Sequence, residues 1–330
     1  MENFFRTIRI IALGFVAIML TSCLDNKYDK KEEEAQEKLD NYLKQNNYTS
    51  EQNIGYGIYV KILKASDASK PKPLVGNTVL MDYDGFKTDG VLFETTDSTN
   101  TGGISDDAVS RMIFGPKRHK IGSLIFGLDT ALRTLREGEH AEIVIPHRYA
   151  YGNAEPVVYN VKLIEVIKSD TVYETKIFNE FIAENGFYDS VNISSGLLYK
   201  FITDDTLKVK RKYTSSDLIT LKITARYAEN YYNNKLGRMF YPRAHESATI
   251  DDYIWGSPAK YPIINAIDSA IKYMDQGEII EIAFKSGAEA PAEFQWGYGD
   301  GGVTDDKYFK LIISAYTPLH YRIEIDTIKQ

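Results

Sequence analysis

The spacing of apolar residues between Gly122 and Gly152 predicts one short helix followed by one strand. Four apolar residues recur at i, i+3, i+4 and i+7, one face of an α-helix: Leu128, Ala131, Leu132 and Leu135. Gly138 follows them, where a left-handed helix cap favours a residue without Cβ. Residues 140–145 then alternate as a strand does. Because so short a helix is not stable alone, we expect it to lie against a sheet, with Tyr151 at the rim.

The same patterns predict the elements that precede and follow this stretch. An amphipathic helix ending near Asn46 and Asn47 is marked by Ala35, Leu39, Tyr42 and Leu43. Strands are expected at residues 57–63, 79–83, 91–93 and 156–163. The polar stretch from Thr95 to Ser110 predicts a long loop or bulge. The polar residues 25–31 and the acidic run 32–34 predict a flexible, solvated tether.

An internal repeat decides the architecture. The helix-glycine-strand segment recurs from Ala266 to Glu278, with its apolar face on Ile267, Ala270, Ile271 and Met274. The segment that begins at Gly196 repeats the one at Gly57, 139 positions earlier. Residues 179–187 echo residues 41–48, and residues 318–321 echo residues 156–159. Several matches in one order predict two copies of one unit.

Length and charge agree with two domains and limit the partners. A chain of 330 residues with 43% hydrophobic content can form two cores. The net charge of -7 argues against nucleic acid as a partner, since phosphate binding needs a basic face.

The N-terminus resembles the signal peptide of bacterial lipoproteins. Arg6 and Arg9 precede an apolar run, residues 10–20, that is too short to span a bilayer. The run ends in Leu-Thr-Ser-Cys23, which resembles a lipobox and implies a signal peptide over residues 1–22 and lipidation of Cys23. Leu24 stands where the inner-membrane retention residue would be aspartate, so we expect the outer membrane of the cell envelope, on its periplasmic or surface face. An uncleaved anchor with a chance cysteine is the alternative.

Five motifs of the first copy, in order, resemble the FKBP family of peptidyl-prolyl cis/trans isomerases over residues 57–168. They are Val79-x-x-x-Tyr83-x-Gly85, Asp89-Gly90-x-x-Phe93-Glu94, Leu124-Ile125-x-Gly127-Leu128, Leu135-x-x-Gly138-Glu139 and Ile145-Pro146-x-x-Tyr149-Ala150-Tyr151-Gly152. The resemblance implies an α+β fold of two tandem FKBP-like domains, each a twisted antiparallel sheet wrapped around a short helix, with a preceding helix. We expect the lipid-anchored tether and helix at 23–50, the first domain at 51–168 and a divergent second domain at 169–330.

The resemblance also implies the site. Tyr83, Phe93, Glu94 and Tyr151 would be catalytic, and Leu124, Ile125, Leu128 and Tyr159 would bind substrate, with Leu128 as the floor. Leu128 and Glu94 stand where the family usually has tryptophan and aspartate. The loop between Gly152 and Tyr159 is short, and the strand before Gly115 offers Ser110, Met112 or Phe114 instead of the family's aromatic residue. Isomerisation of an X-Pro amide needs no metal or cofactor, and none is expected.

The second copy departs further from the family. Its corresponding residues are Tyr227, Phe240, Ile263, Ile264, Ile267, Tyr298 and Tyr321. Tyr241 replaces the acidic residue and Ala266 replaces Gly127, so we expect this copy to be inactive. The five histidines show no ligand spacing and are expected on the surface or on strands, and the aspartates near Gly301 lack calcium-loop spacing.

Two hypotheses follow. The first is a lipid-anchored prolyl isomerase, or rotamase, that assists the folding of proline-containing or unfolded exported proteins, with catalysis in the first copy. The second is a non-catalytic envelope lipoprotein whose degenerate FKBP-like domains bind peptides or a partner. The sequence leaves the oligomeric state open.

Overall fold

The computed structural model describes residues 30–109, 114–187, 191–194, 197–202, 212–214, 217–229, 239–241, 249–254, 265–286, 303–304, 312–313 and 316–329. The chain divides into two compact units at Val166 and Ile167, with the segment Thr96–Arg118 grouped with the second unit. The predicted signal peptide, Cys23 and Ser110 to Ile113 lie outside the described residues. In the described parts, no helix is long and apolar enough to cross a membrane.

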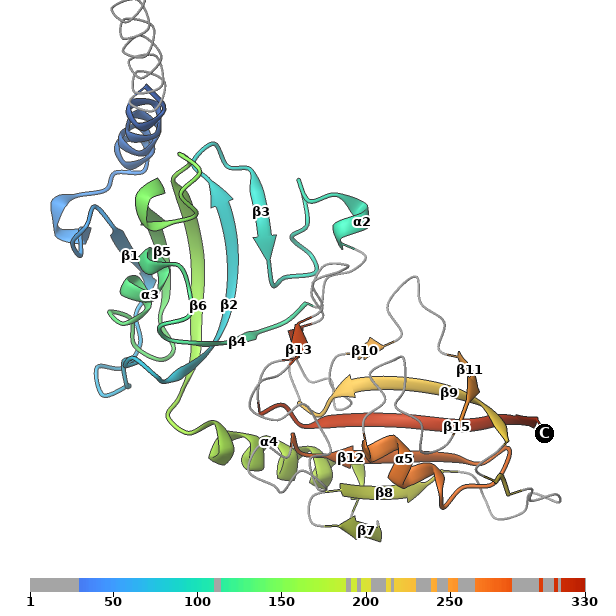
Figure 1. Ribbon diagram of the computed structural model, residues 1–330. Coiled ribbons are helices and arrows are strands. Elements are labelled where there is room, and N and C mark those ends of the chain that lie inside the picture. The colour runs from blue at the N-terminus through green and yellow to red at the C-terminus, as the bar shows by residue number, and fades with distance from the viewer. Residues whose placement is uncertain are drawn as a thin grey trace, which may run out of the picture. The chain divides into compact units, whose positions relative to one another are not determined.

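The first unit is one antiparallel sheet with helices (Figure 1). Its elements are the N-terminal helix (residues 30–45), η1 (Ser50–Gln52), β1 (Tyr59–Lys64), β2 (Thr78–Lys87), β3 (Leu92–Thr95), β4 (Lys117–Lys120), α3 (Phe126–Leu132), β5 (His140–Ile145), η2 (His147–Tyr149) and β6 (Val157–Ile167). The sheet order is β1-β5-β6-β2-β3, and β4 also pairs with β2. The stretch 95–110, expected to be a loop, contains one short helix, α2 (Asp106–Val109).

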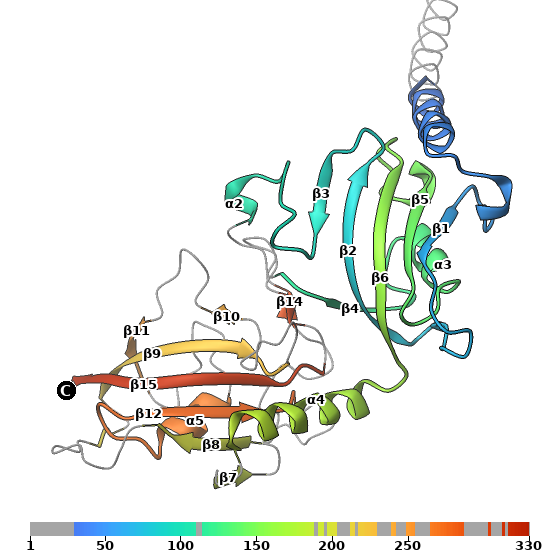
Figure 2. The ribbon, with the colours of Figure 1, turned by 180° about the vertical axis from the view of Figure 1, so that it is seen from behind.

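Different helices pack against the two faces of this sheet; Figures 1 and 2 show α3 beside β5 and the N-terminal helix at the end of the sheet near β1. Side chains alternate along a strand, so neighbouring residues of β5 face opposite sides. Ile143 and Ile145 pack in the core cluster that contains Leu128 of α3. Val144, between them, packs with Leu39 of the N-terminal helix. The apolar pattern of β5 therefore fixes which helix lies on which face.

Helix α3 is shorter than its apolar spacing suggested. It ends at Leu132, whereas Leu135 is buried in the turn that follows. Gly138 is left-handed, with φ of 86°, but its N–H donates to the carbonyl of Leu163 at 2.7 Å. The expectation that Gly138 caps the helix was therefore wrong: the glycine serves the turn into β5.

Helix α3 also lies very close to β5. A Cβ added at Gly127 would lie 2.2 Å from Cγ2 of Ile145 and 3.0 Å from the carbonyl oxygen of Tyr149. Only glycine fits at this crossing without displacement. In the second unit the corresponding residue is Ala266, which is fully buried.

The acidic run 32–34 is helical, so the expected solvated tether was wrong there. Glu32 accepts a hydrogen bond from Arg148 and lies 3.6 Å from Nε2 of His147. Arg148 holds the pKa of Glu32 below its ordinary value. His147 is buried within η2, contrary to the expectation of a surface or strand position. The sequence alone could not show that η2 returns to the first turns of the helix.

The second unit repeats this arrangement. Its elements are α4 (Asp170–Asn185), β7 (Val191–Ser194), β8 (Leu197–Phe201), β9 (Leu218–Tyr227), β10 (Met239–Tyr241), β11 (Thr249–Tyr253), α5 (Asn265–Ile271), β12 (Ile279–Phe284), β13 (Val303–Thr304), β14 (Ile312–Ile313) and β15 (Leu319–Lys329). The order β8-β12-β15-β9-β10 matches β1-β5-β6-β2-β3, and β11 pairs with β9 as β4 pairs with β2. Strands β13 and β14 form a separate two-stranded sheet.

Individual hydrogen bonds recur between the copies. Nζ of Lys61 donates to the carbonyl of Asn46 at 3.1 Å, and Nζ of Lys200 donates to that of Asn185 at 3.0 Å. Gly277 donates to Ile325 at 2.7 Å, as Gly138 does to Leu163. The repeated unit thus includes the helix before each sheet, and the prediction of two tandem FKBP-like domains of α+β class is confirmed.

Candidate active site

An aromatic cluster joins β2, β3, β6 and the turn after η2. The ring of Phe93 lies edge-on to Tyr151 and to Tyr159, with centroid distances of 6.0 and 5.9 Å. Tyr83 lies 6.0 Å from Tyr159. Glu94 follows Phe93 on β3. The structure therefore brings together all four predicted catalytic residues and one predicted substrate-binding residue, Tyr159.

Two short hydrogen bonds connect the polar groups of this cluster. The hydroxyl of Tyr83 donates to Oε1 of Glu94 at 2.6 Å. The hydroxyls of Tyr151 and Tyr159 share a second bond of 2.6 Å. Burial raises the pKa of Tyr83, Tyr151 and Tyr159, and the Glu94 carboxylate raises each further, so these phenols stay protonated.

Gly85 makes the close packing of the rings possible. It lies on β2 opposite Glu94. A Cβ there would lie 2.9 Å from the ring of Phe93 and 3.1 Å from the ring of Tyr159. Real Cβ contacts are not this short, so any larger residue would displace Phe93. The packing of these two rings therefore explains why the motif has glycine at position 85.

The helix side of the site comes from α3 and the loop before it. Leu128 is buried in the core cluster that also holds Tyr83 and Tyr159, and Leu124 and Ile125 pack against that cluster, partly buried. The backbone N–H of Gly122 donates to Oδ2 of Asp129 at 2.9 Å, which ties the start of this loop to α3.

A cavity of about 440 Å³ opens beside the cluster. It is lined by Lys87, Phe93, Glu94, Tyr151, Asn153, Glu155 and Val157. Three of the four predicted catalytic residues line it, whereas Tyr83, Tyr159, Leu124, Ile125 and Leu128 do not. Lys87 was not predicted as a site residue. It follows Tyr83 and Gly85 at alternate positions of β2, so its side chain points to the same face, and this alternation could have identified it.

The short loop after Gly152 contributes the other unexpected lining residues. Glu155 pairs with Lys38 of the N-terminal helix at 2.9 Å. Ala154, just before it, is left-handed with φ of 58°. No local sequence signal connects residues 38 and 155, because only the folded unit brings them together.

The described counterparts of the predicted site residues in the second unit lie in its core or on a strand. Tyr227, Ile267 and Tyr321 are buried in its hydrophobic core. Phe240 and Tyr241 lie on β10. Ile263, Ile264 and Tyr298 lie outside the described residues.

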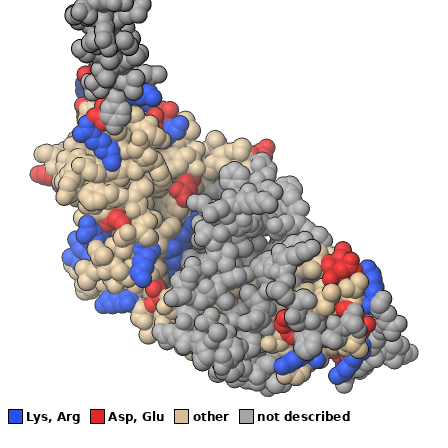
Figure 3. All heavy atoms as spheres, in the orientation of Figure 1, with Lys and Arg blue, Asp and Glu red and all other residues tan. Residues whose placement is uncertain are grey.

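Among the described residues, no group of three His, Cys, Asp or Glu side chains is placed to bind a metal ion. On the face shown in Figure 3, acidic and basic side chains of the first unit lie interspersed. The cavity at β3 is lined by two aromatic rings, Phe93 and Tyr151, together with the charged residues Lys87, Glu94 and Glu155.

Comparison with known proteins assigns the first domain. Residues 69–164 match the family model described as FKBP-type peptidyl-prolyl cis-trans isomerase, which confirms the resemblance carried by the five motifs. Similar solved structures include a peptidyl-prolyl cis-trans isomerase from Pseudomonas syringae pv. tomato, at 23% identity over 41% of this chain and 96% of that chain (TM-score 0.32). FkpA from Escherichia coli is similar at 21% identity over 47% and 70% (TM-score 0.35). The three FKBP domains of wheat FKBP73 are similar at 14% identity over 82% and 94% (TM-score 0.29).

Proposed function

We propose that the first unit, whose residues 69–164 are an FKBP-type peptidyl-prolyl cis-trans isomerase domain, catalyses the cis/trans isomerisation of X-Pro bonds in unfolded exported polypeptides. The observation that supports this most directly is the convergence of Phe93, Glu94 and Tyr151 on one cavity. We further propose that a lipid on Cys23 holds the protein in the cell envelope, and that the second unit is inactive.

Isomerisation of an X-Pro bond requires only that the site bind the twisted amide selectively. Rotation about the X-Pro amide breaks its resonance, at a barrier of roughly 18–20 kcal/mol. A site accelerates the rotation if it binds the twisted amide more tightly than either planar form. The twisted amide has less charge separation than the planar one, so it loses less on leaving water. In this proposal the rings of Phe93 and Tyr151 supply the apolar wall for this step, and the Tyr151 hydroxyl orients a substrate carbonyl.

A non-catalytic, peptide-binding role is the second candidate. The Tyr151 hydroxyl is already bonded to Tyr159 at 2.6 Å, and a substrate carbonyl competes with that bond when Tyr151 is its donor. Leu128, the expected floor, is buried in the core and does not line the cavity. These features are compatible with a pocket that holds prolyl peptides without accelerating their rotation.

A prolyl isomerisation assay on a soluble chain that begins at Leu24 separates the two candidates. We expect acceleration by the wild-type chain and at least a tenfold loss of kcat/KM in Phe93→Ala. Phe201→Ala is the matched control, because Phe201 is an exposed phenylalanine on β8 of the second unit. A folded wild-type chain that binds a prolyl peptide but leaves its rotation at the spontaneous rate would refute the isomerase proposal and support the binding role.

The anchoring proposal has its own test. In bacterial cells supplied with labelled fatty acid, the wild-type chain should become labelled and Cys23→Ser should not. Label that remains on Cys23→Ser would contradict the assignment of the lipidated residue.

A further inference from the structure

Three aromatic side chains outside the cavity form a second, exposed cluster. Tyr56 precedes β1, Phe126 begins α3, and Tyr149 ends η2. Their ring centroids lie 5.2 to 5.5 Å apart in all three pairs. Tyr56 is 63% exposed and Phe126 is 47% exposed. Apolar rings of this size gathered at a surface are a common feature of binding sites.

The backbone holds Tyr56 in an unfavourable conformation to achieve this. Tyr56 has φ of 58°, in the left-handed region that residues with a Cβ rarely adopt. Gly55 and Gly57 on either side also have positive φ. The tight turn thus keeps the tyrosine ring on the outside, where it contributes nothing to the core.

The second copy shows that the fold does not need these rings. Gly57 and Gly196 are equivalent, so Ser195 occupies the position of Tyr56 in the sequence. Helix α3 begins at Phe126 and helix α5 begins at Asn265, so Asn265 occupies the position of Phe126. In the residues that the structure describes, both copies have the same strand order, a helix before the sheet and a short helix packed on it. The aromatic cluster is therefore an addition to the first copy, not a requirement of its architecture.

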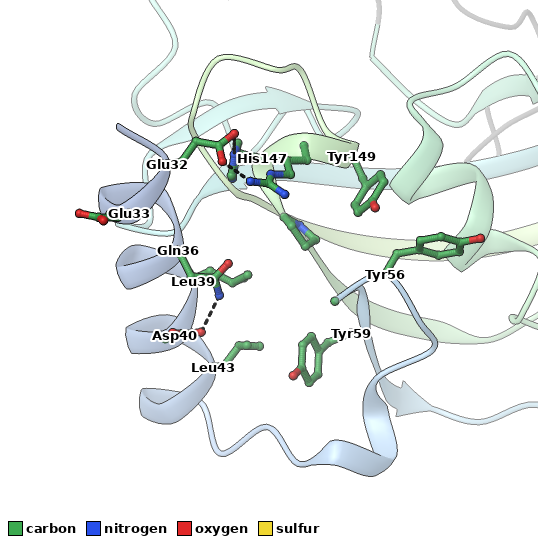
Figure 4. Close-up of a pocket in the computed structure, with 13 residues that line it drawn as sticks. Glu32, Glu33, Gln36, Leu39, Asp40, Leu43, Tyr56, Tyr59, His147 and Tyr149 are labelled. Atoms are coloured by element: carbon green, nitrogen blue, oxygen red, sulfur yellow. Dashed lines mark hydrogen bonds and ion pairs between the residues drawn. The ribbon is translucent and has the colours of Figure 1, made fainter. Parts of the chain in front are cut away.

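A groove adjoins the cluster and shares Tyr56 and Tyr149 with it. The groove has a volume of about 480 Å³ and lies between the N-terminal helix and the elements β1 and η2 (Figure 4). Leu39, Leu43 and Tyr59 give it an apolar base.

The charge of the groove is mainly negative. Glu32 is neutralised by Arg148, the one arginine or lysine in its lining. Glu33 and Asp40 remain as acidic groups of the lining, and Asp40 accepts a hydrogen bond from the neutral amide of Gln36 at 2.9 Å. An occupant with apolar and positively charged side chains would complement both properties.

We propose that the aromatic cluster and this groove bind an extended segment of the substrate polypeptide that carries a proline or aromatic residue next to lysine or arginine. Aromatic surfaces bind proline and other rings by stacking, and they attract cations. Tyr149 of the cluster lies two residues before Tyr151, which lines the cavity, so a bound segment could run from the proposed isomerase site to the cluster. The inference rests on that proposed function for the identity of its ligand.

The test uses the full soluble chain and the residues of the second copy. Tyr56→Ser and Phe126→Asn are each compared with wild type for kcat/KM on a short prolyl tetrapeptide and for the Kd of a labelled twenty-residue peptide of alternating proline, phenylalanine and lysine. We expect the tetrapeptide kcat/KM to stay within about twofold, because it reaches only the cavity. The Kd of the long peptide should rise about tenfold in each variant, the loss expected for one stacked ring.

A charge-reversed peptide, with glutamate for lysine, tests the acidic lining. Wild type should bind it at least about fivefold more weakly, and Asp40→Asn should reduce that preference, whereas Glu51→Gln, an exposed acid on η1 outside the groove, should not. Unchanged long-peptide Kd values in both aromatic variants would overturn the inference. A wild-type chain that binds the long peptide but does not accelerate the tetrapeptide would instead refute the isomerase proposal and leave this binding site standing.

Discussion

Removing one hydroxyl at a time from the Tyr151–Tyr159 pair should have unequal effects on stability. The two hydroxyls share a bond of 2.6 Å, but Tyr159 is 2% exposed and Tyr151 is 51% exposed. Tyr151→Phe leaves the buried Tyr159 hydroxyl without this partner, which costs about 1–3 kcal/mol of unfolding free energy. Tyr159→Phe leaves the Tyr151 hydroxyl free to bond water, at a cost of about 0.5–1 kcal/mol. The double variant should resemble Tyr159→Phe, because it contains no orphaned buried hydroxyl.

Urea denaturation measures these free energies in the soluble chain. Both tryptophans, Trp255 and Trp296, belong to the second half of the sequence, so tryptophan fluorescence follows that unit and serves as the internal control. Far-UV circular dichroism then reports the first unit by difference. With a slope of about 1–3 kcal/mol per molar urea, the expected shifts are resolved. Equal costs for the two single variants would refute the argument from burial.

The same pair has a kinetic consequence. If Tyr151 donates its proton to Tyr159 in the free protein and to a substrate carbonyl in the complex, Tyr159→Phe removes the competing acceptor and should raise kcat/KM in the prolyl isomerisation assay. Tyr151→Phe should lower it. A loss of activity in Tyr159→Phe equal to that in Tyr151→Phe would show that the hydroxyl pair, and not Tyr151 alone, is needed.

Three further predictions concern single contacts. Gly85→Ala should displace the Phe93 ring and lower kcat/KM at least several-fold while the chain stays folded by circular dichroism; full activity would contradict the 2.9 Å contact. Lys61→Met should destabilise only the first unit and Lys200→Met only the second, each by about 1 kcal/mol in urea, since each lysine bonds one helix carbonyl. His320, whose Nε2 lies 3.8 Å from Oε2 of Glu281, lowers the pKa of Glu281 below its ordinary value, and the nearby Lys200 and Arg322 lower it further. Glu281→Gln should therefore be less stable than wild type at neutral pH, and the gap should close as pH falls below 4.5; a gap independent of pH would refute this.

The periodic parts of the fold could be predicted from the sequence. The spacing of Leu128 and Leu132 located α3, and the internal repeat located α5 and the strands that begin near residues 196 and 318. The cap assigned to Gly138 was wrong because apolar spacing continues through Leu135, which is buried in a turn and not in the helix. The spacing of apolar residues indicates which side chains are buried, and here the buried side chains continue past the last residue of the helix.

The site could be predicted only in part, because its geometry depends on contacts between distant segments. The motifs named Phe93, Glu94 and Tyr151 as neighbours, and the structure places them around one cavity. The pairing of Glu155 with Lys38, 117 positions apart, has no local signature. The left-handed Tyr56 also escaped prediction, since the flanking glycines give no indication that the residue between them shares their conformation.

The crossing of α3 over β5 has a consequence for how the two copies can exchange sequence. Gly127 meets Ile145 in the first copy, and the corresponding residues of the second copy are Ala266 and Phe284, both larger. Gene conversion that copied α5 alone into the first copy would bring a methyl group to within 2.2 Å of Ile145. The reverse transfer would only remove a methyl group, which costs about 1 kcal/mol in a helix. At this crossing an exchange of residues between the copies is therefore better tolerated from the first copy to the second than in the reverse direction.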